Sequence, residues 1–320
     1  MTFSEPTRNI LVTGAAGYIG TRLVARLCHQ GCKVYGIDAI ESGVIHENFH
    51  FTQADLLNHE VHQKVFEDLV KDAGFKDKGD VLFHLAGISD AGICEKNPKR
   101  CHEVNRLLAK EVFNSATRVG IKQHIFPSSA QAYGASNSPA LSEAMLLKPI
   151  TVYGQTKALA EEELRQCFKE NAIAADVVRV SNIYGGSFKE GTVMKKIHDQ
   201  IQAKKNPIEV LDRRPVRDFI FIDDVIEGLV RIMLSQLDGK FDVINLGTGK
   251  GTSIDGLIME LTNVFGKTAN ESAPAIEALD SPDDRIVLDI RRLVARTHWR
   301  PGIDLRTGLQ KMMRGSENGG

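Results

Sequence analysis

The sequence predicts an α/β protein built on a doubly wound, mostly parallel sheet. Short β-branched runs alternate with helical stretches through the first half, which is the pattern of βαβ units. The first run leads directly into closely spaced glycines and then into a helical stretch, as in a dinucleotide-binding turn. Together these observations predict a Rossmann sheet, completed by a smaller, discontinuous C-terminal lobe.

The expected elements follow from hydrophobic periodicity. Residues 102–119 carry apolar side chains at helical spacing. After residue 180 the pattern loosens, and strand character returns in "RDFIFIDDV" and "FDVINLGTG". Asp223 or Asp224 is expected to cap the helix after the first of these, and Ser253 a later helix. The strands expected in the first half are "NILVTG", "KVYGID", "FHFTQAD", "DVLFHLAG", "HIFPSSA" and "AADVVRV".

Composition and charge exclude several classes of protein. The 320 residues are 42% hydrophobic and 25% charged, as in ordinary globular proteins, and the net charge of −1 argues against nucleic-acid or anionic-membrane binding. No apolar run approaches the ~20 residues of a membrane span, and the polar start lacks a signal-peptide core, so we expect a cytoplasmic protein. The cysteines are odd in number and lack metal-site spacing, so we expect reduced, mostly buried thiols and no metal. They are Cys28, Cys32, Cys94, Cys101 and Cys167.

The cofactor site is expected in "ILVTGAAGYIG". Gly14 permits the tight turn, Gly17 lets backbone amides approach a pyrophosphate, and Gly20 allows close helix packing. Asp38 ends the second strand, where a carboxylate accepts hydrogen bonds from ribose hydroxyls and repels a 2′-phosphate. The pattern favours NAD over NADP. We therefore predict an NAD-binding Rossmann domain over residues 1–180, with later returns near 219–248, and a mainly substrate-binding lobe over 181–320.

Further cofactor contacts are expected beside these residues. Tyr18 and Ile19 lie within the glycine turn, and Asp55 and Leu56 follow the third strand, where they can meet the adenine edge. Asp55 can equally cap the helix that follows it. Both interpretations remain open from the sequence.

The candidate chemical site lies at the end of the fifth strand and in the helix after it. Ser129 ends the strand "HIFPSSA", and "YGQTK" places Tyr153 and Lys157 on one helix face. A free tyrosine has a pKa of about 10, which a neighbouring ammonium and a cationic nicotinamide would lower. The couple can then take a proton from a carbinol during hydride transfer, and Lys157 can also hold the nicotinamide ribose. Such a pair is common by chance, so its weight comes from the upstream glycine turn.

With these motifs in this order, the chain resembles the extended short-chain dehydrogenase/reductase family, particularly its NAD-dependent sugar-nucleotide epimerases and dehydratases. The resemblance implies that Ala86 and Gly87 line the cofactor and that Asn105 supports the helix near the active site. It also implies that Asn182 and Arg217 face the substrate, Arg217 toward a diphosphate, although Arg217 alone would be read as an ion-pairing residue. The motifs are "TGAAGYIG", "HLAG", "SSAQAYG", "YGQTK", "RVSNIYG", "RDFIFIDDV", "NLGTG" and "WRPGIDLRTGL".

The reaction type follows from what replaces the family's acid pair. Dehydratases of this family carry Asp-Glu where this chain has Ala130 and Gln131, which cannot exchange protons in that way. Gln131 also replaces the glutamate that decarboxylating relatives carry, which argues against a decarboxylase. We therefore expect a sugar-nucleotide epimerase, acting at C4 by transient oxidation to a keto sugar with Tyr153 as acid/base. By the resemblance it is a homodimer that pairs the helices around 102–119 and 153–169.

One departure keeps other functions open. Ser281 stands where many relatives have an arginine that closes on the nucleotide diphosphate, and Arg285 or Arg214 is a candidate substitute. The alternative is an NAD-dependent dehydrogenase or ketoreductase of a small hydroxy compound or modified sugar. A third function, from another class, is a non-catalytic dinucleotide-sensing protein.

Overall fold

The computed structural model describes residues 8–73, 75, 79–235, 239–266 and 284–317. The chain divides into two compact units. Unit 1 comprises Met1–Ala132, Pro149–Arg179 and Leu229–Ile244, and unit 2 comprises Tyr133–Lys148, Val180–Gly228 and Asn245–Gly320.

Within the described residues, seven strands form one sheet in the order β3-β2-β1-β4-β5-β6-β9. β1 pairs in parallel with β2 and β4, as do β2 with β3 and β4 with β5. This order belongs to the Rossmann fold, in which ligands bind beyond the carboxyl ends of the strands. The predicted fold class and all six predicted strands are confirmed. The strands are β1 (Asn9–Thr13), β2 (Lys33–Asp38), β3 (Phe49–Gln53), β4 (Val81–His84), β5 (Gln123–Ser129), β6 (Ala174–Val180) and β9 (Phe241–Leu246).

Helices cover both faces of this sheet. Leu11 of β1 belongs to a core cluster with Phe66, Val112 and Leu164, which come from three different helices. Its strand neighbours, at positions 10 and 12, are fully buried too. Successive strand residues point to opposite faces, so both faces are covered. The helices associated with this sheet are α1 (Gly20–His29), α2 (His59–Ala73), α3 (Ala91–Lys96), α4 (Pro98–His102), α5 (Leu108–Arg118), α6 (Val152–Glu170) and α8 (Ile222–Leu234).

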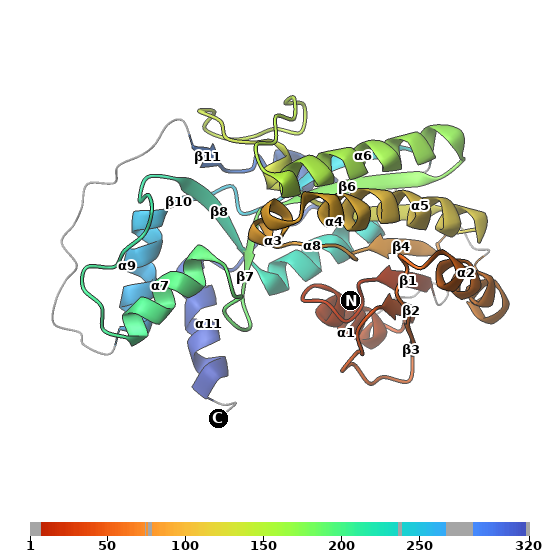
Figure 1. Ribbon diagram of the computed structural model, residues 1–320, viewed down its shortest axis with the longest axis horizontal. Helices are drawn as coiled ribbons and strands as arrows, with labels where there is room; N and C mark the ends of the chain where they lie inside the picture. The colour runs from red at the N-terminus through yellow and green to blue at the C-terminus, as the bar shows by residue number, and fades with distance from the viewer. Residues whose placement is uncertain (1–7, 74, 76–78, 236–238, 267–283, 318–320) are drawn as a thin grey trace. The chain divides into compact units, whose positions relative to one another are not determined.

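The predicted helix over residues 102–119 contains a wide turn. Glu103–Leu107 form a π-helical segment, η1, which joins α4 to α5. In such a turn the hydrogen bonds run five residues back instead of four, and these turns are frequent at functional sites. Asn105 lies in it and is almost fully buried. Figure 1 shows α4 and α5, which follow one another through η1, running alongside α6.

Unit 2 is organised around a small second sheet. β8 (Val216–Phe221) pairs with β7 (Asn182–Tyr184) and β11 (Arg285–Ile286) in parallel and with β10 (Gly251–Ser253) antiparallel. Asp218 of β8 is buried, and its carboxylate accepts hydrogen bonds from Thr248 and Gly249, which fixes the "NLGTG" loop. The helices of this unit are α7 (Val193–Gln202), α9 (Ile254–Phe265), α10 (Arg291–Thr297) and α11 (Leu305–Glu317). Of these, α9 packs against α7 and α11 (Figure 1).

The predicted helix caps are half right. Ser253 caps α9 and accepts a hydrogen bond from the Gly256 amide at 3.0 Å, as expected. α8 begins at Ile222, so Asp223 and Asp224 lie inside its first turn and not at the cap. The apolar run that ends β8 continues straight into the helix, which moves the start toward the N-terminus. In the first turn of α8 these carboxylates still interact favourably with the positive end of the helix dipole.

Candidate active site

Two glycines of the turn, Gly14 and Gly20, occupy positions where a side chain would collide with the backbone. Gly14 has φ +74°, and a Cβ there would lie 2.5 Å from the backbone nitrogen of Ala86. A Cβ at Gly20 would meet the carbonyl oxygen of Gly14, so the helix start approaches the turn closely. At Gly17 the nearest atom to such a Cβ is that same oxygen, at 3.2 Å. The turn thus brings the N-terminus of α1, whose first amides can bind a phosphate, close to the end of β1.

Asp38 ties the second strand to this turn. Its Oδ2 accepts a hydrogen bond from the Ala16 amide at 2.9 Å, and its Oδ1 accepts one from Ile40 at 3.3 Å. A carboxylate has about four acceptor positions, so it can still accept two ribose hydroxyls. Tyr18 carries the Arg22 guanidinium over its ring at 4.8 Å, and Ile19 immediately precedes α1. The residues present thus fit a dinucleotide.

The other expected cofactor contacts have mixed surroundings. Asp55 accepts a hydrogen bond from the Leu57 amide at 3.0 Å, so it makes a local turn. Leu56 is buried in the core, and only its backbone is suited to meet a ligand. Ala86 packs on the glycine turn, and the Asn105 carboxamide oxygen lies 3.0 Å from a Cβ placed at Gly87. Their roles in cofactor binding stay predictions.

The three candidate chemical residues come together in unit 1. Ser129 is the last residue of β5, and Tyr153 lies in the first turn of α6. Thr151 caps that helix by accepting from the Gly154 amide at 3.0 Å. Burial raises the pKa of the Tyr153 phenol to about 12, and a side-chain hydrogen bond with Ser129 acts in the opposite direction. Without a cofactor, therefore, the phenol stays protonated at neutral pH.

Lys157 lies one turn further along the same helix. Its ammonium donates to the Pro127 carbonyl oxygen at 3.0 Å and lies 4.6 Å from the centre of the Phe126 ring. Burial lowers the pKa of Lys157 to about 8, while the charge of Glu161 raises it. The ammonium is thus fixed at the carboxyl end of β5.

A buried ion pair supports this end of the strand. Glu161 accepts from the Ser128 hydroxyl at 2.5 Å and forms a 2.7 Å salt bridge with Arg179 of β6. All three side chains are buried. Ser128 lies between Ser129 and Pro127, whose carbonyl oxygen accepts from Lys157. The ion pair therefore fixes the backbone that positions Ser129 and Lys157.

Behind the site lies a neutral histidine. His84 ends β4, and its Nδ1 lies 2.7 Å from the Thr13 hydroxyl at the end of β1. Burial lowers the pKa of His84 to about 3, with Lys157 acting in the same direction. An uncharged imidazole therefore joins the ends of two strands beside the glycine turn.

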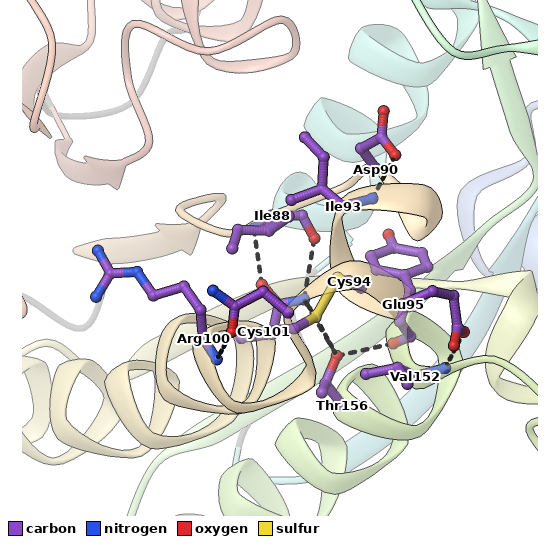
Figure 2. Close-up of a disulfide and its surroundings, with 12 residues drawn as sticks. Ile88, Asp90, Ile93, Cys94, Glu95, Arg100, Cys101, Val152 and Thr156 are labelled. Atoms are coloured by element: carbon purple, nitrogen blue, oxygen red, sulfur yellow. Dashed lines mark hydrogen bonds between the residues drawn. A yellow bond between two sulfur atoms is a disulfide. The ribbon is translucent and has the colours of Figure 1, made fainter.

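The expected reduced state of all five cysteines is wrong, because Cys94 and Cys101 form a disulfide (Figure 2). It joins α3 to α4, and both residues are fully buried. Cys28, Cys32 and Cys167 are buried free thiols, as expected. The sequence pattern could not reveal the pair, because Pro98 starts a new helix and so turns the chain back between the two residues.

The expected substrate residues lie in unit 2. Asn182 begins β7 and pairs with Phe219 of β8. Arg217 forms a 2.9 Å salt bridge with Asp284 and also donates to its backbone carbonyl, so its guanidinium is already engaged. Arg214 is paired with Asp212 at 2.9 Å. Ser281 lies outside the described residues.

Sequence reasoning missed several supporting residues. Glu161 could have been noticed because it lies four residues after Lys157 and so shares its helix face. Thr151 carried an N-cap signal directly before the tyrosine motif. The pairing of His84 with Thr13 carried no sequence signal, because neighbouring strands of the sheet bring the two together.

The described residues contain neither a membrane-spanning helix nor a cluster of metal-ligating side chains. Within them, no helix has both the length and the apolar character needed to cross a bilayer. Nor do they contain three or more histidine, cysteine or acidic side chains placed together to hold a metal ion.

A Rossmann sheet with a glycine turn, an acidic residue after the second strand and a Ser-Tyr-Lys set defines a dinucleotide-dependent enzyme of the short-chain dehydrogenase/reductase type. The family model of the NAD dependent epimerase/dehydratase family matches residues 10–247. The chain belongs to this family. It is therefore an NAD-dependent enzyme of the extended type, and not a non-catalytic sensor.

Individual relatives span nearly the whole chain. UDP-glucose 4-epimerase of Bacillus subtilis is 26% identical over 95% of this chain and 94% of its own length. The dTDP-4-dehydro-6-deoxyglucose reductase of Escherichia coli is also 26% identical, covering 95% and 96%. Among solved structures, UDP-glucose 4-epimerase of Thermotoga maritima with UDP-glucose superposes with a TM-score of 0.81 at 25% identity, covering 97% and 99%.

Proposed function

We propose that the protein is an NAD-dependent sugar-nucleotide 4-epimerase that acts on a UDP-sugar. The observation that carries the proposal is the Ser129, Tyr153 and Lys157 set at the end of β5, combined with a neutral Gln131 where an elimination would need an acid or base. The Gln131 side chain has a structural contact, because its Oε1 accepts a hydrogen bond from the Thr151 hydroxyl at 3.1 Å. Proton exchange with C5 or C6 of a sugar has no residue there to perform it.

In the mechanism, Tyr153 takes the proton of the sugar 4-hydroxyl and returns it to the same oxygen once the keto sugar has turned over, so that C4 is inverted. Ser129 donates a hydrogen bond to the developing keto oxygen, and Lys157 keeps a positive charge close to the phenolate. NAD, when bound, supplies the hydride acceptor and donor at C4, with a cationic ring that favours the phenolate. The glycine turn and Asp38 would hold it, together with Tyr18, Ile19, Asp55, Leu56, Ala86 and Gly87.

The remaining parts of the proposal concern substrate and assembly. Asn182 and Arg217 are proposed to contact the nucleotide sugar, for which Arg217 must exchange Asp284 for the diphosphate. Arg–phosphate pairs are bidentate and charge-assisted, so such an exchange costs little. We further propose a cytoplasmic homodimer that pairs the helices η1–α5 and α6 of each copy.

The test follows both the sugar and the cofactor. The purified protein is incubated with UDP-glucose or UDP-galactose and NAD, and the products are quantified by chromatography. We expect interconversion to the same equilibrium from either side, with no net NADH absorbance at steady state. NADH formed in proportion to the sugar consumed contradicts the proposal.

A second candidate is a reductase of a keto sugar nucleotide, which the similarity to the E. coli reductase supports. The same Ser-Tyr-Lys set would protonate the carbonyl oxygen as hydride arrives. The incubation is repeated with a 4-keto dTDP-sugar and NADH. Stoichiometric NADH loss together with no interconversion of the UDP-sugars selects this function.

A further inference from the structure

The disulfide packs directly against the proposed catalytic tyrosine. Cys94, Cys101 and Tyr153 form one buried cluster, with Val152 beside it. The two cysteines belong to α3 and α4, helices of six and five residues. Isolated helices this short are unstable, so their position depends on tertiary contacts and on the covalent link.

One side of the disulfide supports the start of the catalytic helix. Glu95 follows Cys94, and its Oε1 accepts a hydrogen bond from the Val152 amide at 2.8 Å (Figure 2). The first amides of a helix have no partner within the helix, so this contact completes the first turn of α6. Tyr153 is the next residue.

The other side reaches the same turn by a second route. Cys101 Sγ lies 3.3 Å from the Nδ2 donor of Asn105. It also lies 3.6 Å from the Thr156 hydroxyl (Figure 2). The Asn105 amide also donates to the Thr156 oxygen at 3.1 Å, and that hydroxyl donates to the Tyr153 carbonyl at 2.8 Å. A displacement of Cys101 is thus transmitted to the Tyr153 backbone through hydrogen bonds.

We propose that the Cys94–Cys101 disulfide is a positioning element for Tyr153, so that reduction of the disulfide lowers turnover. This inference rests on the proposed function of Tyr153. Reduced sulfurs separate to van der Waals contact, which pushes α3 and α4 apart and loosens both routes to the first turn of α6. Disulfides in reducing compartments are usually catalytic or redox-sensing, so turnover would follow the thiol–disulfide balance of the surroundings.

The redox step is an ordinary exchange. Both sulfurs are buried in the closed fold, so a thiolate of dithiothreitol attacks one of them when α3 and α4 open locally. It forms a mixed disulfide and releases one cysteine thiol, and its second thiol then closes a ring and releases the other. The products are two cysteine thiols and the cyclic disulfide. Glutathione disulfide reverses the change, oxidising the two thiols and leaving as two molecules of glutathione.

The first measurement does not need turnover. Thiols counted after denaturation should be three in the oxidised protein and five in the reduced one. Hydrogen exchange is then compared in the full chain with bound NAD. We expect the amides of residues 152–157 to exchange about tenfold faster after reduction, because local opening becomes easier, while β1 and β2 are unchanged. Equal exchange in the two states overturns the inference.

The second measurement uses the proposed reaction. Reduction should lower kcat for the UDP-sugar interconversion about tenfold with KM unchanged, because misplacement of a catalytic group acts on the chemical step, and glutathione disulfide should restore it. The double variant Cys94→Ser, Cys101→Ser should have the low rate and ignore reductant. Cys167→Ser removes a buried free thiol from α6, the helix that carries Tyr153. This variant should still lose turnover on reduction. Equal kcat in both states overturns the inference, whereas no turnover in either state overturns the proposed function and leaves the exchange result to decide.

Discussion

At the scale of single residues, the site is defined by burial of groups that must change charge. Burial favours the neutral forms of both Tyr153 and Lys157, raising the pKa of the first and lowering that of the second. The protein alone therefore does not create a phenolate. We infer that the cofactor's positive charge completes the acid/base couple, which links proton transfer to the presence of NAD.

The first prediction concerns the phenol itself. Tyr153→Phe should lower kcat for epimerisation by about 10²–10⁴, the usual range for a general acid or base, while bound NAD is retained. Tyr35→Phe is a matched control, because Tyr35 is also buried in unit 1 and its hydroxyl has no hydrogen-bond partner. Chromatography of the sugars measures the rates. Full epimerase turnover by Tyr153→Phe would refute the acid/base role.

The second prediction concerns the stability of the folded state against pH. The pKa of Lys157 is lowered from 10.5 to about 8 in the fold. Between those values the folded state binds fewer protons than the unfolded state, so stability from this residue rises with pH. The free energy of unfolding of the wild type, relative to Lys157→Met, should increase from about pH 8 to about pH 10 in urea titrations.

That window avoids the opposite effect of Tyr153, whose raised pKa lowers stability only above its ordinary value of 10. Lys64→Met is the control, since Lys64 is exposed on α2, outside the helices of the proposed dimer. A difference between wild type and Lys157→Met that stays flat across the window would show that Lys157 is not desolvated.

At the scale of elements, the turn from β1 to α1 depends on two separable properties of glycine. Gly14 needs both a positive φ and the absence of a Cβ, which would collide with the Ala86 backbone. Gly31 needs only the positive φ, since nothing lies within 4 Å of a Cβ there. The pair therefore separates backbone strain from the close approach that forms the cofactor turn.

The third prediction compares alanine at these two positions. Gly31→Ala should cost about 1–2 kcal/mol for the left-handed backbone and leave NAD binding unchanged. Gly14→Ala should cost more and abolish NAD binding, because the turn must move away from Ala86 to admit the methyl group. Thermal unfolding and NAD titration measure both effects. Unaltered NAD affinity in Gly14→Ala would contradict the expected role of the turn.

The elements predicted well from sequence are those with a local cause. The six strands of the first half, the glycine turn and the Ser253 cap are specified by periodicity or by a conformational requirement within a few residues. Features missed are those that form between distant segments. The bridge between Cys94 and Cys101 depends on tertiary packing, which no local pattern encodes. The sequence indicated that Arg217 could form an ion pair, but the choice of Asp284 as its partner depends on packing too.

At the scale of the whole molecule, the expected ligand contacts divide between the units. The glycine turn, Asp38 and the Ser-Tyr-Lys set all belong to unit 1, whereas Asn182 and Arg217 belong to unit 2. Each unit has a sheet of its own. Cofactor and nucleotide sugar should therefore leave separate signatures on the chain.

The fourth prediction tests this division by hydrogen exchange. NAD alone should slow exchange in the glycine turn, at the end of β2 and in the first turn of α6, because a ligand stabilises the parts of the native state that bind it. Added UDP should slow exchange in β7 and β8 of the NAD-bound protein. AMP, which lacks the uracil base, is the control for the second step. Protection of β7 and β8 by NAD alone would contradict the division.

The wide turn at η1 makes the length of this segment a constraint in its own right. The extra residue in the turn brings Asn105 to Ile88 and Thr156, with which its amide forms hydrogen bonds of 2.9 and 3.1 Å. Deletion of one neighbouring residue would restore an ordinary helix and rotate Asn105 by about 100°. Single-residue deletions here should therefore be far less tolerated than substitutions, even where the deleted side chain is exposed.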